Sequence, residues 1–252
     1  MQYKLAHIYR IPILGSFQKS FGQSLHAAFQ RMLALHQMRA TAEQGSLFGK
    51  TEDGRQKTGE FKVTEEEALK IFEETWIDEW YENRKQHDEH LEQGRKAVRN
   101  FWRACCERVP DVLEVEKGFI LQFGQHSLKG KIDRVDRLPD LPTGQAGETV
   151  AIIDYKTGRA KEKLETEDKE QLWLYQIALE NRGMKVGKLA YQYVIDWVTT
   201  EVEPLTGQKR EDFLSKIEER MQAILASDFE ATPDPFTCNY CDFKNICEYR
   251  KL

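Results

Sequence analysis

The 252-residue chain lacks any long uninterrupted apolar segment. No run approaches the roughly 18 consecutive apolar side chains that a membrane-spanning helix needs. Nor does the N-terminus read as a secretory signal, because Lys4, His7 and Arg10 fall where such a signal would have an apolar core and a small-residue cleavage site. We therefore expect no membrane partner and a cytoplasmic location.

Excess basic charge is also missing. Lys and Arg number 37 against 42 Asp and Glu, which gives a formal net charge of -5 at pH 7. Proteins that coat nucleic acid through bulk electrostatics carry a basic excess, because non-specific affinity comes mainly from neutralising phosphates. Any contact with DNA must therefore be local. The 40% hydrophobic and 31% charged residues are typical of a folded globular protein rather than a disordered one.

Cysteine is scarce and its count is odd. Five cysteines, of which Cys105 and Cys106 are neighbours, do not suit the disulfide framework of a secreted protein. The spacing of the other three brings three thiolates within reach of one soft metal site, one ligand short of a closed tetrahedron. These residues are Cys238, Cys241 and Cys247, in a C-terminal cysteine segment at 233–252. The alternative is three unrelated buried cysteines.

Apolar periodicity and turn residues divide the chain into helices and strands. The simplest interpretation is one domain over 1–252 with a helical insertion at 48–108, whose long charged helix opens with a capping-box pattern at Thr64 and Glu67. Strands interleaved with helices predict a layered α/β or α+β architecture. Further helices are expected at 20–38, 168–180 and 210–226, and strands at 112–123, 128–138, 150–156 and 189–197.

An acid and a base end the strongly apolar strand 150–156. Period-two alternation places Asp154 and Lys156 on the same face of that strand. Ionisable groups at the end of a buried strand are expensive unless they pair with each other or bind a ligand. For an isolated Asp-x-Lys, a structural salt bridge is therefore the favoured interpretation.

The preceding strand adds another carboxylate. A hairpin would place Asp133 opposite Asp154, and two carboxylates at a sheet edge form an oxygen-rich site suited to Mg²⁺ or Mn²⁺. A metal there would activate water and clamp a phosphate, while the Lys156 ammonium would stabilise charge that develops in the transition state. Asp136, between Arg134 and Arg137, is interpreted instead as part of a surface ion pair.

Three more side chains could reach this site. Gln171 and Tyr175, four apart on a helix, share one face and could hold Lys156 or a DNA phosphate. His26 lies beside the apolar stripe of its helix, and its imidazole would favour Mn²⁺ over Mg²⁺. The structural alternatives are a core tyrosine, a solvated glutamine and a core histidine.

The order and spacing of these motifs resemble the RecB-type branch of the PD-(D/E)xK superfamily. This branch includes the nuclease domains of the bacterial RecB and AddB recombination enzymes and similarly folded CRISPR-associated exonucleases. The resemblance runs from about residue 20 to 250 and departs at the long helical insertion. The segments that carry it are 22–26, 130–133, 154–156 and 171–175.

The resemblance implies a fold, a chemistry and a context. The fold would be a restriction-endonuclease-like mixed central sheet flanked by helices, and the chemistry metal-dependent hydrolysis of DNA phosphodiester bonds in repair or recombination. His26, Asp133, Asp154 and the Tyr155 carbonyl would bind the metal, and Lys156 would be catalytic. Gln171 and Tyr175 would support the site. A helicase domain, in the same or an associated chain, would be a partner.

Local charge agrees with a DNA track beside the site. Arg159, Lys161 and Lys163 follow the strand that carries Lys156 in a glycine-containing loop, and they are our candidate DNA-binding residues. An ordinary solvated loop is the alternative.

The cysteine segment gains an interpretation from the resemblance. In iron-sulfur relatives a matching triplet is completed by a cysteine upstream of the nuclease core, whereas here no cysteine precedes Cys105. We therefore expect a [4Fe-4S] cluster or zinc in a longer native protein, held incompletely or not at all by this chain.

Two rival hypotheses remain at the level of sequence. A degenerate nuclease fold could only bind DNA or brace a helicase, but it would have no need of the complete Asp133, Asp154 and Lys156 set. A zinc-ribbon module built on the C-terminal cysteines would leave the Asp-x-Lys strand unexplained.

Overall fold

The computed structural model describes residues 1–13, 15–44, 60–124, 126–138, 149–227 and 229–251. The chain forms two compact units. The core unit spans Phe17–Leu205, and the terminal unit joins Met1–Ser16 with Thr206–Leu252. The start of the expected helical insertion, residues 48–59, lies outside the described residues.

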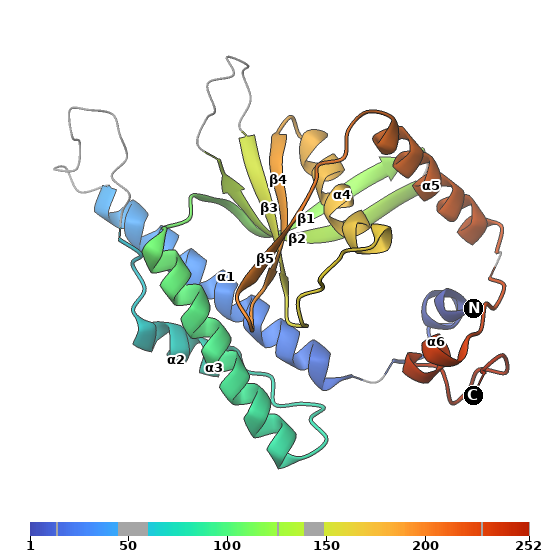
Figure 1. Cartoon of the computed structure of the whole chain (residues 1–252), viewed down its shortest axis with the longest axis horizontal. Helices are drawn as coiled ribbons and strands as arrows, with labels where there is room; N and C mark the ends of the chain where they lie inside the picture. The colour runs from blue at the N-terminus through green and yellow to red at the C-terminus, as the bar shows by residue number, and fades with distance from the viewer. Residues whose placement is uncertain (14, 45–59, 125, 139–148, 228, 252) are drawn as a thin grey trace. The chain divides into compact units, whose positions relative to one another are not determined.

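A five-stranded sheet forms the centre of the core unit (Figure 1). Its order is β1-β2-β3-β4-β5, and only the β3–β4 pair is parallel among these strands. A parallel pair needs a crossover, which α4 (Thr166–Glu180) supplies. The mixed sheet with flanking helices confirms the predicted restriction-endonuclease-like α/β fold. The strands are β1 Val112–Phe123, β2 His126–Arg137, β3 Thr149–Lys156, β4 Lys185–Tyr193 and β5 Val198–Val202.

Three helices pack together beside the sheet (Figure 1). They are α1 (Phe17–Gln44), α2 (Glu65–Thr75) and α3 (Arg84–Glu107). The predicted capping box opens α2, since the Thr64 side chain accepts from the Glu67 backbone N–H and the Glu67 carboxylate accepts from that of Thr64. The Asn83 side chain caps α3 in a similar way.

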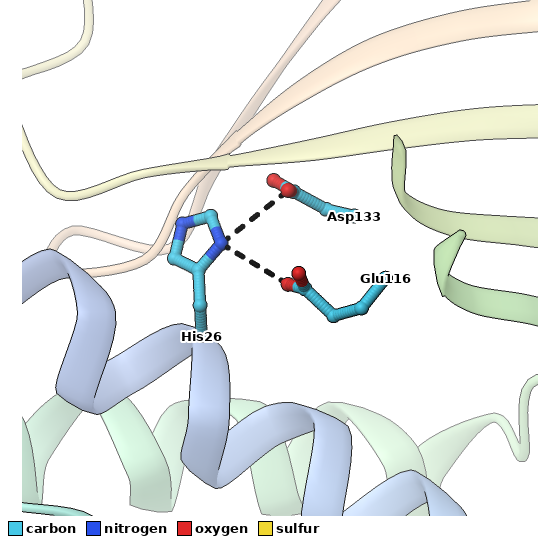
Figure 2. A group of neighbouring side chains, drawn as sticks. All are labelled: His26, Glu116 and Asp133. Carbon is cyan, nitrogen blue, oxygen red and sulfur yellow. Dashed lines mark ion pairs between the residues drawn. The ribbon is translucent and has the colours of Figure 1, made fainter. Parts of the chain in front are cut away.

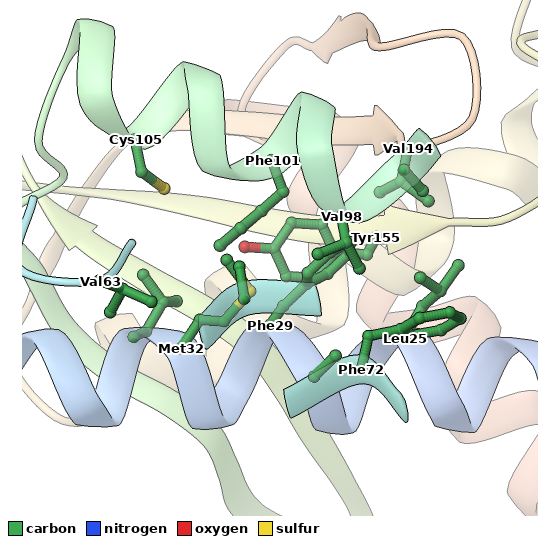
Figure 3. Packing of buried hydrophobic residues seen from close by; sticks show 14 of the residues in the cluster. Leu25, Phe29, Met32, Val63, Phe72, Val98, Phe101, Cys105, Tyr155 and Val194 are labelled. Atoms are coloured by element: carbon green, nitrogen blue, oxygen red, sulfur yellow. The ribbon is translucent and has the colours of Figure 1, made fainter. Parts of the chain in front are cut away.

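The main hydrophobic core lies between these helices and the sheet (Figure 3). The rings of Phe29 on α1 and Phe101 on α3 stack at 4.3 Å, and the Tyr155 ring from β3 packs edge-on against both. Burying such a phenylalanine stabilises a fold by roughly 1.5–3 kcal/mol. The described part of the expected insertion, residues 60–108, is therefore an integral wall of the core.

Three sequence expectations need correction. The long charged helix expected from Thr64 is two helices, α2 and α3, because the backbone becomes extended at Trp76 and helix resumes only after the Asn83 cap. The strand expected at 189–197 ends at Tyr193, because the chain turns there and Trp197 adopts a φ of 54° before β5, a strand that the sequence did not predict. The ion pair expected at Asp136 exists with Arg134, but it is not on the surface: the two side chains are 13% and 12% exposed. Arg137 pairs with Asp111 instead.

The terminal unit contains a π-helix at Lys4–Ile8, α5 (Gly207–Leu225) and the short α6 (Pro235–Tyr240). Within it, the rings of Tyr3 and Phe229 stack at 5.7 Å and so join the two ends of the chain. Among the described residues, no helix combines the length and apolar character that crossing a membrane requires.

Candidate metal and active site

The end of β3 presents its charged side chains on one face of the sheet. Lys156 Nζ lies 2.7 Å from Asp154 Oδ2, and the Asp154 side chain is only 3% exposed against 35% for Lys156. The Asp154 carboxylate is therefore buried, whereas the Lys156 ammonium is partly exposed to solvent. Asp154 Oδ2 has no partner with hydrogen-bond geometry in the described part of the chain, despite this short ion pair. That oxygen therefore keeps a lone pair available for a cation.

Asp133 on β2 brings a second carboxylate to the same place. Arg134 pairs with Ile153 in the antiparallel β2–β3 register, so Asp133 comes next to the end of β3. Its Oδ2 accepts a hydrogen bond from the Tyr155 backbone N–H at 2.8 Å. Burial, followed by the negative charge of Asp133, raises the pKa of Asp154 to about 6. A buried carboxylate beside a second negative charge favours a bound divalent cation.

His26 reaches the carboxylates from α1 (Figure 2). Its Nδ1 lies 3.3 Å from Asp133 Oδ1 and 3.4 Å from Glu116 Oε1, and its Nε2 lies 3.2 Å from the Tyr155 carbonyl oxygen. Burial lowers the pKa of His26, but the hydrogen bonds and charges of Asp133 and Glu116 outweigh burial and raise it to about 10. A protonated imidazole thus balances the carboxylates, and a metal ion would compete with that proton.

Glu116 on β1 is the acidic neighbour that sequence reasoning missed. Its side chain is 8% exposed and also pairs with Lys131. One ligand atom each from His26, Glu116 and Asp133 lie within 4.8 Å of one another. Glu116 also has a φ of 52°, a left-handed conformation that is uncommon for a non-glycine residue and concentrates at functional sites. Glu114 lies two positions before Glu116 in β1, so period-two alternation predicts the same strand face for both. Spacing alone could therefore not distinguish Glu116 from Glu114.

Helix α4 holds the lysine through a chain of hydrogen bonds. Lys156 Nζ donates to Gln171 Oε1 at 2.8 Å, and Gln171 Nε2 donates to the Tyr175 hydroxyl at 2.6 Å. The ammonium also lies 4.8 Å from the centre of the Tyr191 ring, a contact that the sequence did not predict. Burial, and next the charge of Asp154, raises the pKa of Tyr175, so its hydroxyl stays protonated. These hydrogen bonds orient the Lys156 ammonium beside the carboxylates.

A model of the PD-(D/E)XK nuclease superfamily matches residues 1–248. The chain belongs to this superfamily. No curated protein matches the chain. A solved structure described as "Crystal structure of SSO0001" is similar over 67% of this chain and 81% of its own, at 18% sequence identity and a TM-score of 0.37. That likeness is too weak to carry an argument.

Nucleases of this superfamily generally use divalent metal ions, and the donor set of this chain fits one. It combines an imidazole nitrogen, buried carboxylates and a backbone carbonyl, and the Asp154 oxygen lacks a hydrogen-bond partner within the described ranges. Carboxylate and carbonyl oxygens suit Mg²⁺ or Mn²⁺, and the imidazole favours the latter.

The basic loop after β3 is exposed in this PD-(D/E)XK nuclease fold. Lys161 pairs with Asp168 at the start of α4, which raises the pKa of the lysine. Arg159 and Lys163 make no ion pair with any residue that the structure describes. These two side chains are therefore the freer candidates for phosphate contacts.

The C-terminal cysteines lie in the terminal unit and are half-buried thiols. Among the described residues, ligating atoms of His26, Glu116 and Asp133 lie within 4.8 Å of one another, whereas the sulfur atoms of Cys238, Cys241 and Cys247 do not. The three thiols therefore do not form the compact set that a single zinc ion binds.

Proposed function

We propose that this chain is a metal-dependent deoxyribonuclease of the RecB-type branch that hydrolyses phosphodiester bonds in DNA repair or recombination. The observation that carries the proposal is the convergence of Asp133, Asp154 and Lys156 at the end of a buried strand, with His26 arriving from α1. A buried aspartate with a raised pKa destabilises the metal-free protein, so a cluster of this kind is characteristic of a functional site.

His26, Asp133, Asp154 and the Tyr155 carbonyl would hold the metal, and Glu116 is close enough to join them. A bound divalent cation lowers the pKa of a water ligand and neutralises charge on a phosphate. The β2–β3 hydrogen bond between Asp133 and the Tyr155 N–H fixes the carboxylate next to the carbonyl. The ligands are thus ordered by the sheet before any substrate arrives.

Lys156 would act on the scissile phosphate. A preorganised ammonium stabilises negative charge that develops on phosphate oxygens more strongly in a water-poor site than in bulk water. Gln171 fixes the position of Nζ and Tyr175 fixes Gln171, so both are positioning residues. Arg159 and Lys163, with Lys161 if it leaves Asp168, would bind backbone phosphates along the loop.

A helicase partner and a metal in the cysteine segment remain proposals that rest on the resemblance. The three half-buried thiols would supply three ligands to a [4Fe-4S] cluster or zinc, which this chain would hold incompletely. Iron, sulfide and zinc analysis of this chain and of an N-terminally extended version tests the proposal. Metal-free protein in both cases, with reduced thiols, would contradict it.

Cleavage is tested with end-labelled single-stranded and double-stranded DNA in the presence of Mg²⁺, Mn²⁺ or EDTA. We expect products with Mn²⁺ or Mg²⁺ and none with EDTA. The alternative, an inactive fold that binds DNA or braces a helicase, predicts DNA binding with no products under any of these conditions. Lys156→Ala serves as the matched inactive protein and guards against a contaminating nuclease.

A further inference from the structure

A cavity of about 240 Å³ lies on the other face of the sheet from the metal site. One wall is formed by α3, which contributes Phe101, and by Arg108, the extended residue that directly follows the helix. Its floor contains Ile153 and Tyr155, which alternate along β3 with the charged residues of the metal site. Figure 3 shows Tyr155 and Phe101 from this side of the sheet. The cavity is therefore separate from the metal site.

The lining carries positive charge in a chain whose net charge is -5. It includes Arg108, Arg134 and Lys188 and no acidic residue. Arg134 forms an ion pair with Asp136 and donates a hydrogen bond to the Tyr155 hydroxyl. Lys188 forms an ion pair with Glu201. Arg108 is exposed, and its guanidinium makes no ion pair or hydrogen bond with any residue that the structure describes. Arg108 is therefore a cation of the cavity lining that has no acidic partner among the described residues.

Gln192 on β4 places an unsatisfied donor in the same lining. The residue is only 8% exposed, and its Oε1 accepts a hydrogen bond from Thr199 Oγ1 at 2.6 Å. Its Nε2 has no hydrogen-bond partner within the described part of the chain. A buried donor left without a partner destabilises the protein. An acceptor oxygen in the cavity would remove that destabilisation.

Aromatic rings supply the apolar wall. Trp197 has a φ of 54° in the turn between β4 and β5, and its ring packs edge-on against Phe101 at 6.2 Å. A non-glycine residue in this conformation is held there by its surroundings. The cavity thus combines a flat apolar surface with an arginine and an amide donor.

We propose that this cavity binds a small anion that carries a flat ring, with its phosphate or carboxylate group at Arg108 and Gln192 and its ring against Trp197 and Phe101. The volume is below the range of drug-sized ligand pockets, so the ligand is small. The proposal does not depend on nuclease activity.

Calorimetric titration of the full chain in EDTA tests this site, with phenyl phosphate, phenol and inorganic phosphate as probes. EDTA removes the divalent ions through which a phosphate could bind at the metal site. Phenyl phosphate should bind at least about tenfold more tightly than either fragment, since each fragment lacks one of the two contacts. Equal binding of phenol and phenyl phosphate, or no binding of phenyl phosphate at millimolar concentrations, would overturn the proposal.

Variants locate the binding. Arg108→Ala and Gln192→Glu should each weaken phenyl phosphate binding by about tenfold or more, because one removes a charge-assisted contact and the other places a carboxylate beside the anion. Arg103→Ala, an equal charge change at an exposed position of α3 outside the lining, should bind as the wild type does. Lys156→Ala should also bind normally. Wild-type binding by both cavity variants, or loss of binding in Lys156→Ala alone, would contradict the assignment.

Discussion

Asp133 on β2 accepts a hydrogen bond from the backbone N–H of Tyr155 on β3 at 2.8 Å. The carbonyl of the same Tyr155 lies 3.2 Å from His26 Nε2. One residue of β3 therefore connects the β2 carboxylate with the α1 imidazole through its backbone, while its side chain is anchored in the core against Phe29 and Phe101. The packing of the core thereby orders the proposed metal ligands.

Lys156→Ala should reduce cleavage by about 10²- to 10³-fold, the usual effect of losing one preorganised electrostatic donor. Binding of Mn²⁺ and the melting temperature should change little, because the ammonium is partly exposed. Lys185→Ala, an exposed lysine at the far end of β4, is the matched control and should cleave normally. Wild-type activity in pure Lys156→Ala would exclude the lysine from catalysis.

Asp154→Asn should stabilise the metal-free protein at pH 7 while it abolishes cleavage. Because the folded pKa of Asp154 is raised from 3.8 to about 6, its ionisation opposes folding. The Asp154 side chain contributes most to the free energy of unfolding below about pH 4, where it is protonated in both states. This contribution is lost as the pH rises through 6. The variant should gain roughly 1–3 kcal/mol in urea unfolding at pH 7 with EDTA, and less at pH 4.5. A less stable variant at pH 7 would show that the Asp154 carboxylate supports the fold.

His26→Ala should weaken metal use more than it weakens folding. The Mn²⁺ concentration for half-maximal cleavage should rise at least about tenfold, since even indirect partners of a metal site affect affinity by 10- to 100-fold. The wild-type affinity for Mn²⁺ should increase as the pH rises towards 10, because the metal displaces the His26 proton. An unchanged metal requirement with a large fall in melting temperature would make His26 a core residue only.

Glu116→Gln should raise the Mn²⁺ requirement, because it removes a carboxylate charge that lies close enough to the proposed metal ligands to bind the ion directly. Glu114→Gln is its control: this residue lies two positions away in the same strand and pairs with Arg182. Equal effects of the two substitutions on metal titration would show that Glu116 acts only through general charge.

The sequence predicted the fold where periodicity is strong. The apolar runs around β1, β2 and β3 and the capping box of α2 led to correct elements, and the hairpin correctly joined β2 to β3. It failed at β5, because Trp197 turns the chain with a φ of 54° and no glycine marks the turn. The neighbours Glu116 and Tyr191 escaped prediction because each depends on strand register and packing across the sheet. Alternation along a single strand cannot supply that information.

The central claim is that Asp133, Asp154 and His26 hold a catalytic metal ion beside Lys156. It is tested most directly by measuring Mn²⁺ binding by electron paramagnetic resonance and DNA cleavage on the same samples of wild-type protein and Asp154→Asn. We predict that the wild type binds Mn²⁺ and cleaves DNA, and that Asp154→Asn loses both while it remains folded. A folded Asp154→Asn protein that binds Mn²⁺ and cleaves DNA as the wild type does would contradict the claim.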